Sequence, residues 1–173
     1  MSHDGDRPGP KDPPYPVGLL LTGRMVVVVG GGHVAQRRTD ALLESGAAIT
    51  VVSPRLHPDL RPYVESGRIQ WIERVYAHGD LRDAWYAMAT TDQPDVNAAV
   101  VAEADAARIF CVRADEALRG TAWTPASGHH DEITVAVMAN RNPHKAAATR
   151  DALLEALTRG VHGDETDAHG RDG

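Results

Sequence analysis

The chain has 173 residues and a formal net charge of −6, and its length suits one domain or one domain with a small appendage. The acidic balance argues against a general nucleic-acid-binding role and means that any anionic ligand needs a local basic pocket. We expect neither a membrane span nor a signal sequence, because no apolar segment is long enough and the first residues lack the charged-then-apolar pattern. The single cysteine, Cys111, lies in an apolar run. The apolar surroundings predict that its thiol is buried. A single cysteine allows no disulfide within the chain and suits a reducing cytoplasm.

Two strongly polar stretches mark the ends of the chain. Residues 1–14 are rich in proline, glycine and charge, which predicts a disordered leader. Residues 160–173 are rich in glycine, aspartate and histidine, which predicts a disordered tail. Its histidines, His162 and His169, are expected to be solvated, and no metal site is expected.

Between these ends, strand-like and helix-like patterns alternate. This alternation predicts a Rossmann-like α/β fold with a doubly wound parallel sheet over residues 15–115. The expected strands are 25–29, 48–53, 69–74, 85–90 and 109–113. The expected helices are 33–45, 56–66, a short one at 79–83, and 94–106.

After Asp115 the pattern changes. Strands are expected at 122–127 and 132–138, joined through residues 128–131, and a helix follows over about 143–158. Two strands and one helix are too few to bury a core of their own. Residues 116–159 should therefore pack on the first domain or on a second copy, which predicts a homodimer.

The most informative pattern lies where the first strand meets the first helix. A run of valines ends in clustered glycines, giving the fingerprint G-x-G-x-x-G/A as Gly30, Gly32 and Ala35. The first glycine permits a tight turn, the second lets a pyrophosphate approach the backbone, and the small third residue lets helix and strand pack closely. The free N–H groups at the start of the helix then face the phosphates. The pattern predicts a dinucleotide site.

The acidic residue expected about twenty residues past the glycines, which binds the ribose hydroxyls, is missing. Ser53, Pro54 and Arg55 stand there instead. Ser53 can still bond to a ribose hydroxyl. Arg55 can pair with the 2′-phosphate of NADP, or it can simply be an exposed arginine at a helix start.

Several stretches carry a resemblance to a known family. They are Tyr15-Pro16-Val17, the glycine segment from Val29 to Arg38, Val51-Val52-Ser53-Pro54, Ala89-Thr90-Thr91-Asp92 with Asn97, Ile109 to Asp115, and Pro125-Ala126. Together they cover about residues 15–157, and the chain resembles the precorrin-2 dehydrogenase family, the N-terminal module of siroheme synthases. In one departure, the family's Asn-Val-Val before its essential aspartate is Val112-Arg113-Ala114 here.

The resemblance implies NAD-dependent oxidation of precorrin-2 to sirohydrochlorin, on the route to siroheme or cobalamin. It also implies a dimer formed through the segment after the nucleotide-binding domain, and some members insert ferrous iron into the product. The family's essential aspartate falls on Asp115. The residues matched to the NAD site are Gly30, Gly31, Gly32, His33, Val34, Ala35, Ser53, Pro54, Thr90 and Thr91.

Asp115 lies just after the last strand of the expected parallel sheet, at the edge where such sheets bind ligands. The reaction removes a hydride and a proton, and a carboxylate within hydrogen-bond reach can take the proton. By position alone, a cap of a turn or of a helix start is the favoured role for Asp115. The resemblance favours the catalytic role.

Precorrin-2, the substrate that the resemblance implies, carries several carboxylates, so its binding site needs cationic side chains. Basic residues gather around the predicted appendage. Arginine binds a carboxylate through two parallel hydrogen bonds, which favours Arg113 and Arg141. The candidate substrate-binding residues are Arg113, Arg119, Arg141 and Lys145. For each of them, solvated surface charge is the alternative.

The pair His129-His130 has a simpler interpretation than a metal site. Adjacent residues of a strand point to opposite faces and rarely share one ion. We therefore predict that this pair belongs to a hairpin turn.

Two other functions compete with the dehydrogenase. One is an NAD(H)-binding redox sensor without catalysis, which would need neither Asp115 nor a basic pocket. The other is a chelatase that has lost nucleotide use, against which the intact glycine turn argues.

Overall fold

The computed structural model describes residues 13–140 and 142–164, with side chains as far as Gly160. Its contacts divide the chain into two compact units that meet between Trp123 and Thr124. This division falls later than the predicted boundary after Asp115. Each unit is described by itself.

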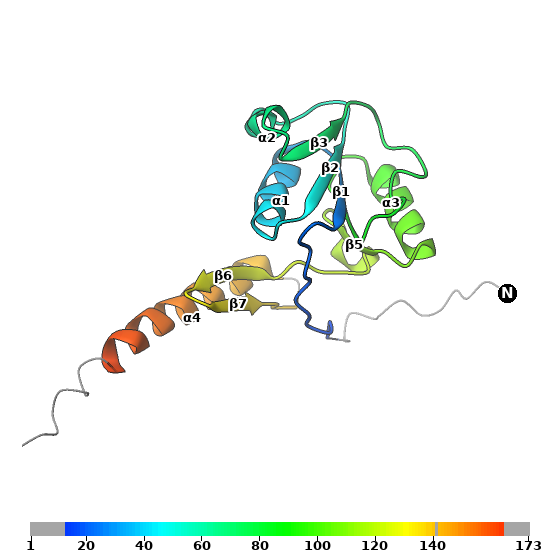
Figure 1. Cartoon of the computed structure of the whole chain (residues 1–173). Coiled ribbons are helices and arrows are strands. Elements are labelled where there is room, and N and C mark those ends of the chain that lie inside the picture. The colour runs from blue at the N-terminus through cyan, green and yellow to red at the C-terminus, as the bar shows by residue number, and fades with distance from the viewer. Residues whose placement is uncertain (1–12, 141, 165–173) are drawn as a thin grey trace, which may run out of the picture. The chain divides into compact units, whose positions relative to one another are not determined.

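The first unit contains a parallel sheet with the strand order β3-β2-β1-β4-β5 (Figure 1). Its strands are β1 Met25–Val29, β2 Ala48–Val52, β3 Ile69–Ile72, β4 Tyr86–Ala89 and β5 Phe110–Arg113. The order reverses between β1 and β4, and open α/β sheets bind their ligands at such a switch point. The predicted fold class and all five strands are confirmed, each to within one or two residues.

The strand register brings the loops that follow the parallel strands to one edge of the sheet. Val29 is aligned with both Val52 and Ala89, and Ala89 is aligned with Arg113. The residues that follow these strands, among them Gly30, Ser53 and Thr90, therefore share the carboxyl edge of the sheet.

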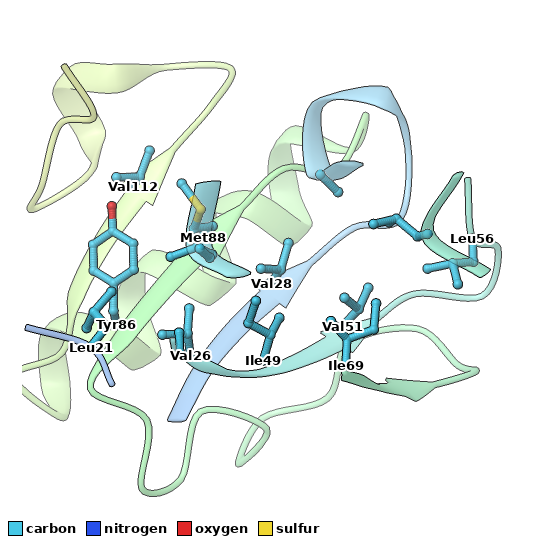
Figure 2. Packing of buried hydrophobic residues seen from close by; sticks show 14 residues of the cluster. Leu21, Val26, Val28, Ile49, Val51, Leu56, Ile69, Tyr86, Met88 and Val112 are labelled. Atoms are coloured by element: carbon cyan, nitrogen blue, oxygen red, sulfur yellow. The ribbon is translucent and has the colours of Figure 1, made fainter. Parts of the chain in front are cut away.

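Helices cover both faces of this sheet. They are α1 His33–Glu44 and α2 Arg61–Glu65 on one face and α3 Pro94–Ala106 on the other, with short 3₁₀ turns η1 at Pro58–Leu60 and η2 at Ala117–Arg119 (Figure 1). Val26 and Val28 pack on the α1 side, as Figure 2 shows, whereas Val27 and Val29 pack on the α3 side. Burial on both faces explains why β1 is a continuous apolar run rather than an alternating one.

Two predicted helices differ from the structure. The helix expected over 56–66 is divided into η1 and α2, each of which has a proline in its first turn, Pro58 and Pro62. A proline lacks the N–H that would continue a preceding helix, so each one starts a new turn. The short helix expected at 79–83 is absent, and these residues form turns.

A buried carboxylate fixes the connection between β3 and β4. Glu103 on α3 accepts hydrogen bonds from the Tyr76 hydroxyl and from the backbone N–H groups of Gly79 (2.9 Å) and Leu81 (3.0 Å). The Nδ1 atom of His78 lies 3.2 Å from the same carboxylate. Burial alone would raise the pKa of Glu103, but the hydrogen bonds from Tyr76 and the two amides outweigh it and lower the pKa.

We expect this anchor to weaken in acid. Because the pKa of Glu103 is lower in the folded chain than in the unfolded chain, its contribution to stability is present at neutral pH and is lost as the pH falls through the folded pKa. Hydrogen exchange should show the amides of Gly79 and Leu81 losing protection towards acid pH in the wild-type chain. In Glu103→Gln they should be weakly protected at every pH, whereas Glu73→Gln, at an exposed position of the same connection, should behave as wild type. Unchanged protection in Glu103→Gln would contradict the anchoring role.

The second unit is a hairpin with one helix. Strand β6 (Ala126–His130) pairs antiparallel with β7 (Ile133–Val137), and α4 (Pro143–Asp164) contacts both strands. A Cβ on Gly128 would lie 2.5 Å from Cδ1 of Leu154, so the glycine lets the helix approach the hairpin closely.

Two boundaries in this unit correct the sequence prediction. His129 and His130 belong to β6, and the chain turns at the next two residues, where Asp131 adopts a φ of 51°. Aspartate tolerates this left-handed conformation, so the turn needs no glycine. Helix α4 continues past the expected end near Thr158 to Asp164, into the segment predicted to be disordered. The remainder of both predicted disordered ends, residues 1–12 and 165–173, lies outside the described residues.

Candidate functional site

The glycine turn follows β1 and has three different steric environments. Gly30 has a φ of +114°, and a Cβ there would lie 2.7 Å from Oγ1 of Thr90. A Cβ on Gly31 would lie 2.1 Å from the carbonyl oxygen of Arg55, whereas a Cβ on Gly32 would meet nothing within 4 Å. Gly30 and Gly31 thus have to be glycine because a side chain at either position would collide with neighbouring protein atoms. Gly32 leaves open space beside the backbone, as the approach of a pyrophosphate needs.

Helix α1 begins directly at this open position. Gly32 is its N-cap, and no side chain caps the free N–H groups there. An uncapped helix start favours an anion, because the N–H groups and the helix dipole both point at it. His33 and Val34 are exposed in the first turn, and Ala35 is fully buried against the sheet. The turn, the open backbone and the close helix packing therefore all match the predicted fingerprint.

The contrast between Gly31 and Gly32 can be tested directly. Gly31→Ala should destabilise the chain by roughly 1–3 kcal/mol or more, because the new methyl group would overlap a backbone carbonyl that has little room to move. Gly32→Ala is the matched control and should change the unfolding free energy much less. Chemical denaturation followed by circular dichroism measures both. Equal stability of the two variants would contradict the steric argument.

The segment after β2 folds back onto the glycine turn. The Ser53 hydroxyl donates to the carbonyl of Arg55 (2.6 Å), and the backbone N–H of His57 donates to the carbonyl of Gly31 (2.7 Å). Ser53 is buried and its hydroxyl is engaged inside the protein, while Pro54 and Arg55 are exposed. The residues that stand in place of the ribose-binding acid therefore lie next to the glycine turn.

His57 is a neighbour of the site that the sequence pattern does not reveal. Its ring packs edge-on against the ring of His33, with centroids 5.9 Å apart. No spacing rule connects these two histidines in the sequence, because the contact arises only when the segment after β2 folds over the start of α1.

The hydroxyls of the two threonines after β4 are engaged in hydrogen bonds within the protein. The hydroxyl of Thr90 donates to the carbonyl of Val29 (2.9 Å), so it joins β4 to β1 at the switch point. The hydroxyl of Thr91 accepts from the N–H of Gln93 (3.1 Å) and donates to Oδ1 of Asn97 (2.8 Å). Both threonines thus shape the loop that enters α3.

Asp115, just beyond β5, lies in a dense polar network. Arg113 donates from Nε to Oδ1 and from Nη2 to Oδ2 of Asp115, each at 3.0 Å. Asn97 donates from Nδ2 to Oδ1 at 2.9 Å. The Arg113 guanidinium lowers the pKa of Asp115, and the Asn97 bond adds to this against the opposing effect of burial. Asp115 is therefore a carboxylate anion at neutral pH.

Asn97 belongs to the sequence pattern only as part of a motif, and the structure gives it a specific place. It is fully buried, and besides Asp115 it bonds to the N–H, the hydroxyl and the carbonyl of Thr91. Asn97 thereby joins the loop after β4 to the loop after β5. The sequence could have indicated this role through the position of Asn97 in the first turn of α3, because that turn meets the carboxyl edge of the sheet.

The four predicted substrate-binding cations are in different situations. Arg113 is buried against Asp115, and Arg119 is exposed and donates to Glu116 (3.2 Å). Lys145 is exposed in the first turn of α4, in the second unit. Arg141 lies outside the described residues. Of the three cations that the structure describes, Arg113 is the one for which a contact with Asp115 is found.

Three further features of the described part of the chain concern the requirements of a metal site, a membrane span and a reactive thiol. Within it, no group of three histidine, cysteine, aspartate or glutamate side chains is arranged to hold a metal ion. No helix there is long and apolar enough to cross a membrane. Cys111 is buried, which raises the pKa of its thiol to about 12, as expected for a structural cysteine.

A five-stranded parallel sheet with an open glycine turn at its switch point defines a dinucleotide-binding domain. In agreement, residues 17–126 match a family model described as "Putative NAD(P)-binding". The chain is 34% identical over 142 residues to siroheme synthase 3 of Aeromonas hydrophila and 33% identical over 156 residues to siroheme synthase 1 of Serratia proteamaculans. The chain belongs to the family of siroheme synthase NAD-binding modules and SirC-type precorrin-2 dehydrogenases.

A solved structure supports the same conclusion. The protein named "SirC, precorrin-2 dehydrogenase" superposes with a TM-score of 0.69 at 26% sequence identity, over 82% of this chain and 70% of that one. The two siroheme synthases are much longer than this chain. The matches cover 82% and 90% of this chain but only 30% and 33% of those proteins.

Proposed function

We propose that the chain is an NAD-dependent dehydrogenase that oxidises precorrin-2 to sirohydrochlorin. The observation that carries this proposal is the shared edge of the sheet: the open turn at Gly32 and the Asp115 carboxylate follow parallel strands of the same sheet. A dinucleotide and a proton acceptor can therefore serve one substrate. The SirC relative is itself named a precorrin-2 dehydrogenase, which supports the same activity here.

The chain's own residues suit the two halves of the reaction. The backbone at Gly32 and the uncapped start of α1 fit a pyrophosphate, and the bound nicotinamide would supply the hydride acceptor. Asp115 is anionic at neutral pH and can take the proton that leaves the macrocycle. Its bonds to Arg113 and Asn97 orient the carboxylate before substrate arrives.

The cations proposed to bind the substrate carboxylates are Arg119, Arg141 and Lys145. Arg119 and Lys145 are exposed, as a site for a polycarboxylate requires. Arg113 is buried against Asp115, so we assign it to the acidic centre instead.

We propose NAD rather than NADP as the cofactor, following the family. Arg55 is exposed next to the glycine turn and remains the candidate for a 2′-phosphate. Calorimetry with NAD and NADP, on the wild-type chain and on Arg55→Ser, distinguishes the two. An affinity for NADP that exceeds that for NAD and disappears in Arg55→Ser would reverse this assignment.

The direct test is an anaerobic assay with precorrin-2 and NAD. We expect NADH absorbance to rise together with the spectrum of sirohydrochlorin. Binding of NAD without turnover would instead favour the redox sensor, which the glycine turn alone supports equally well. Addition of ferrous iron to the product tests iron insertion separately. We place this activity in the cytoplasm, where the free thiol of Cys111 stays reduced.

We further propose a homodimer formed through the second unit. Ile133 on β7 and Leu153 on α4 are apolar and exposed on an element too small for a core of its own. Light scattering should give the mass of a dimer at micromolar concentration, and Ile133→Glu should shift it towards the monomer. Val75→Glu, at an equally apolar and exposed position of the first unit, should leave the dimer intact. A monomeric wild-type chain would refute this proposal.

A further inference from the structure

We propose that Arg113 is a positioning residue of the dehydrogenase, which fixes the Asp115 carboxylate at the end of β5 and holds it deprotonated until it takes the substrate's proton. The inference rests on the proposed function, because it assumes that Asp115 takes the substrate's proton. It adds a role for an arginine that the sequence had suggested as a substrate ligand.

The geometry of the pair points to positioning. Arg113 is the last residue of β5 and is only 8% exposed, so a rigid strand holds its backbone and the protein surrounds its side chain. Its two bonds engage both oxygens of Asp115, which leaves the carboxylate no freedom to rotate. A third bond, from Nη2 to the carbonyl of Pro94 at 3.3 Å, ties the guanidinium to the start of α3.

The Asp115 side chain is more exposed than that of Arg113, as expected if substrate meets the carboxylate and not the guanidinium. The Asp115 side chain is 32% exposed, whereas that of Arg113 is 9% exposed. An approaching substrate therefore meets the carboxylate, with the guanidinium behind it. Arg113 acts on the reaction through Asp115 and not by touching the macrocycle.

Two other acids also interact with the guanidinium. Glu116 lies 3.7 Å from Nη2, and Asp95, in the first turn of α3, contributes a further negative charge. Asn97 is the remaining polar neighbour of Asp115. The hydrogen bond from Arg113 is the largest of the causes that lower the pKa of Asp115, and the Asn97 bond adds to it, whereas burial opposes both.

The test begins with the substrate-free chain. Titration of the Asp115 carboxyl carbon by NMR should give a pKa below the ordinary value of about 3.9. Arg113→Met retains the length of the buried stem without a charge, and it should raise this pKa by about one unit or more. Arg113→Lys retains the charge but loses the paired bonds, so it should fall between the two. Glu116→Gln is the matched control, which removes a neighbouring charge without altering the pair and should produce no upward shift.

Turnover supplies the second measurement. The acid limb of the pH profile of kcat should move to higher pH in Arg113→Met by the same amount as the titration, while NAD affinity stays unchanged. A merely structural arginine would lower kcat at every pH and leave the limb in place. If Arg113→Met fails to fold, the wild-type and Arg113→Lys titrations still decide the question.

The proposal is overturned if Asp115 titrates at or above about 3.9 in the wild-type chain, or if loss of the guanidinium leaves its titration unchanged. Failure of the proposed function has a different signature. In that case no variant oxidises precorrin-2 at any pH, although the NMR titrations still show the coupling between Arg113 and Asp115.

Discussion

Asp115→Asn is expected to lower turnover on precorrin-2 by a factor on the order of 10² or more, the usual scale for a lost general acid or base. An amide cannot take the proton that leaves the substrate. NAD affinity should change little, because the carboxylate is proposed to face the macrocycle and the pyrophosphate is proposed to lie at Gly32. The rate of NADH formation and calorimetry with NAD measure the two quantities.

Asparagine is a better replacement than alanine at this position. Alanine would leave the buried Arg113 cation without its partner, and an unpaired buried charge destabilises the fold. The amide oxygen of asparagine can still accept one of the arginine's hydrogen bonds. Glu116→Gln, at the adjacent carboxylate, should retain wild-type turnover. If Asp115→Asn oxidises precorrin-2 at the wild-type rate, Asp115 caps a turn and the base is another group.

Gly32→Asp is expected to abolish NAD binding while the chain stays folded. A Cβ at this position would meet nothing within 4 Å, so the first side-chain atom needs no shift of the surrounding protein. Aspartate is a favourable N-cap, and its charge interacts well with the start of α1, so the unfolding temperature should be unchanged or higher. The same carboxylate would stand where we propose that the phosphates bind, and like charges repel.

Gly32→Asn separates the effect of charge from that of size. It is nearly the same shape as aspartate and is neutral, so it should weaken NAD binding less than Gly32→Asp does. Calorimetry gives the affinities and circular dichroism checks the fold. Retained NAD affinity in a folded Gly32→Asp chain would place the pyrophosphate elsewhere.

The sheet and the glycine turn could be predicted from the sequence because local rules determine both. Runs such as residues 25–29 are rich in β-branched valine, and the positive φ of Gly30 is a local demand that glycine meets. The turns at residues 79–83 could not be predicted in this way. They depend on Glu103, which lies on a different element and becomes a partner only after folding.

The pairing of Arg113 with Asp115 shows the same limit within the candidate site. The sequence places the two residues near the carboxyl edge, but it does not tell whether an arginine there faces the solvent or its neighbour. The decisive facts are the burial of β5 and the approach of Pro94 and Asn97 from α3, and both are tertiary. The departure from the family pattern at Val112-Arg113-Ala114 indicated that this segment is unusual, but it did not indicate that Arg113 pairs with Asp115.

The close approach of Gly31 to the carbonyl of Arg55 makes two loops structurally interdependent. The backbone of one loop is proposed to bind the phosphates, and the other occupies the position that selects the cofactor in this fold. Exchanges of the exposed side chains at Pro54 and Arg55 should leave that contact intact, because the backbone carbonyl of Arg55 makes it. An insertion or deletion between Ser53 and His57 would displace Gly31 as well. We therefore expect point substitutions in the loop after β2 to leave the glycine turn in place, whereas a change in the length of that loop is expected to disturb both loops.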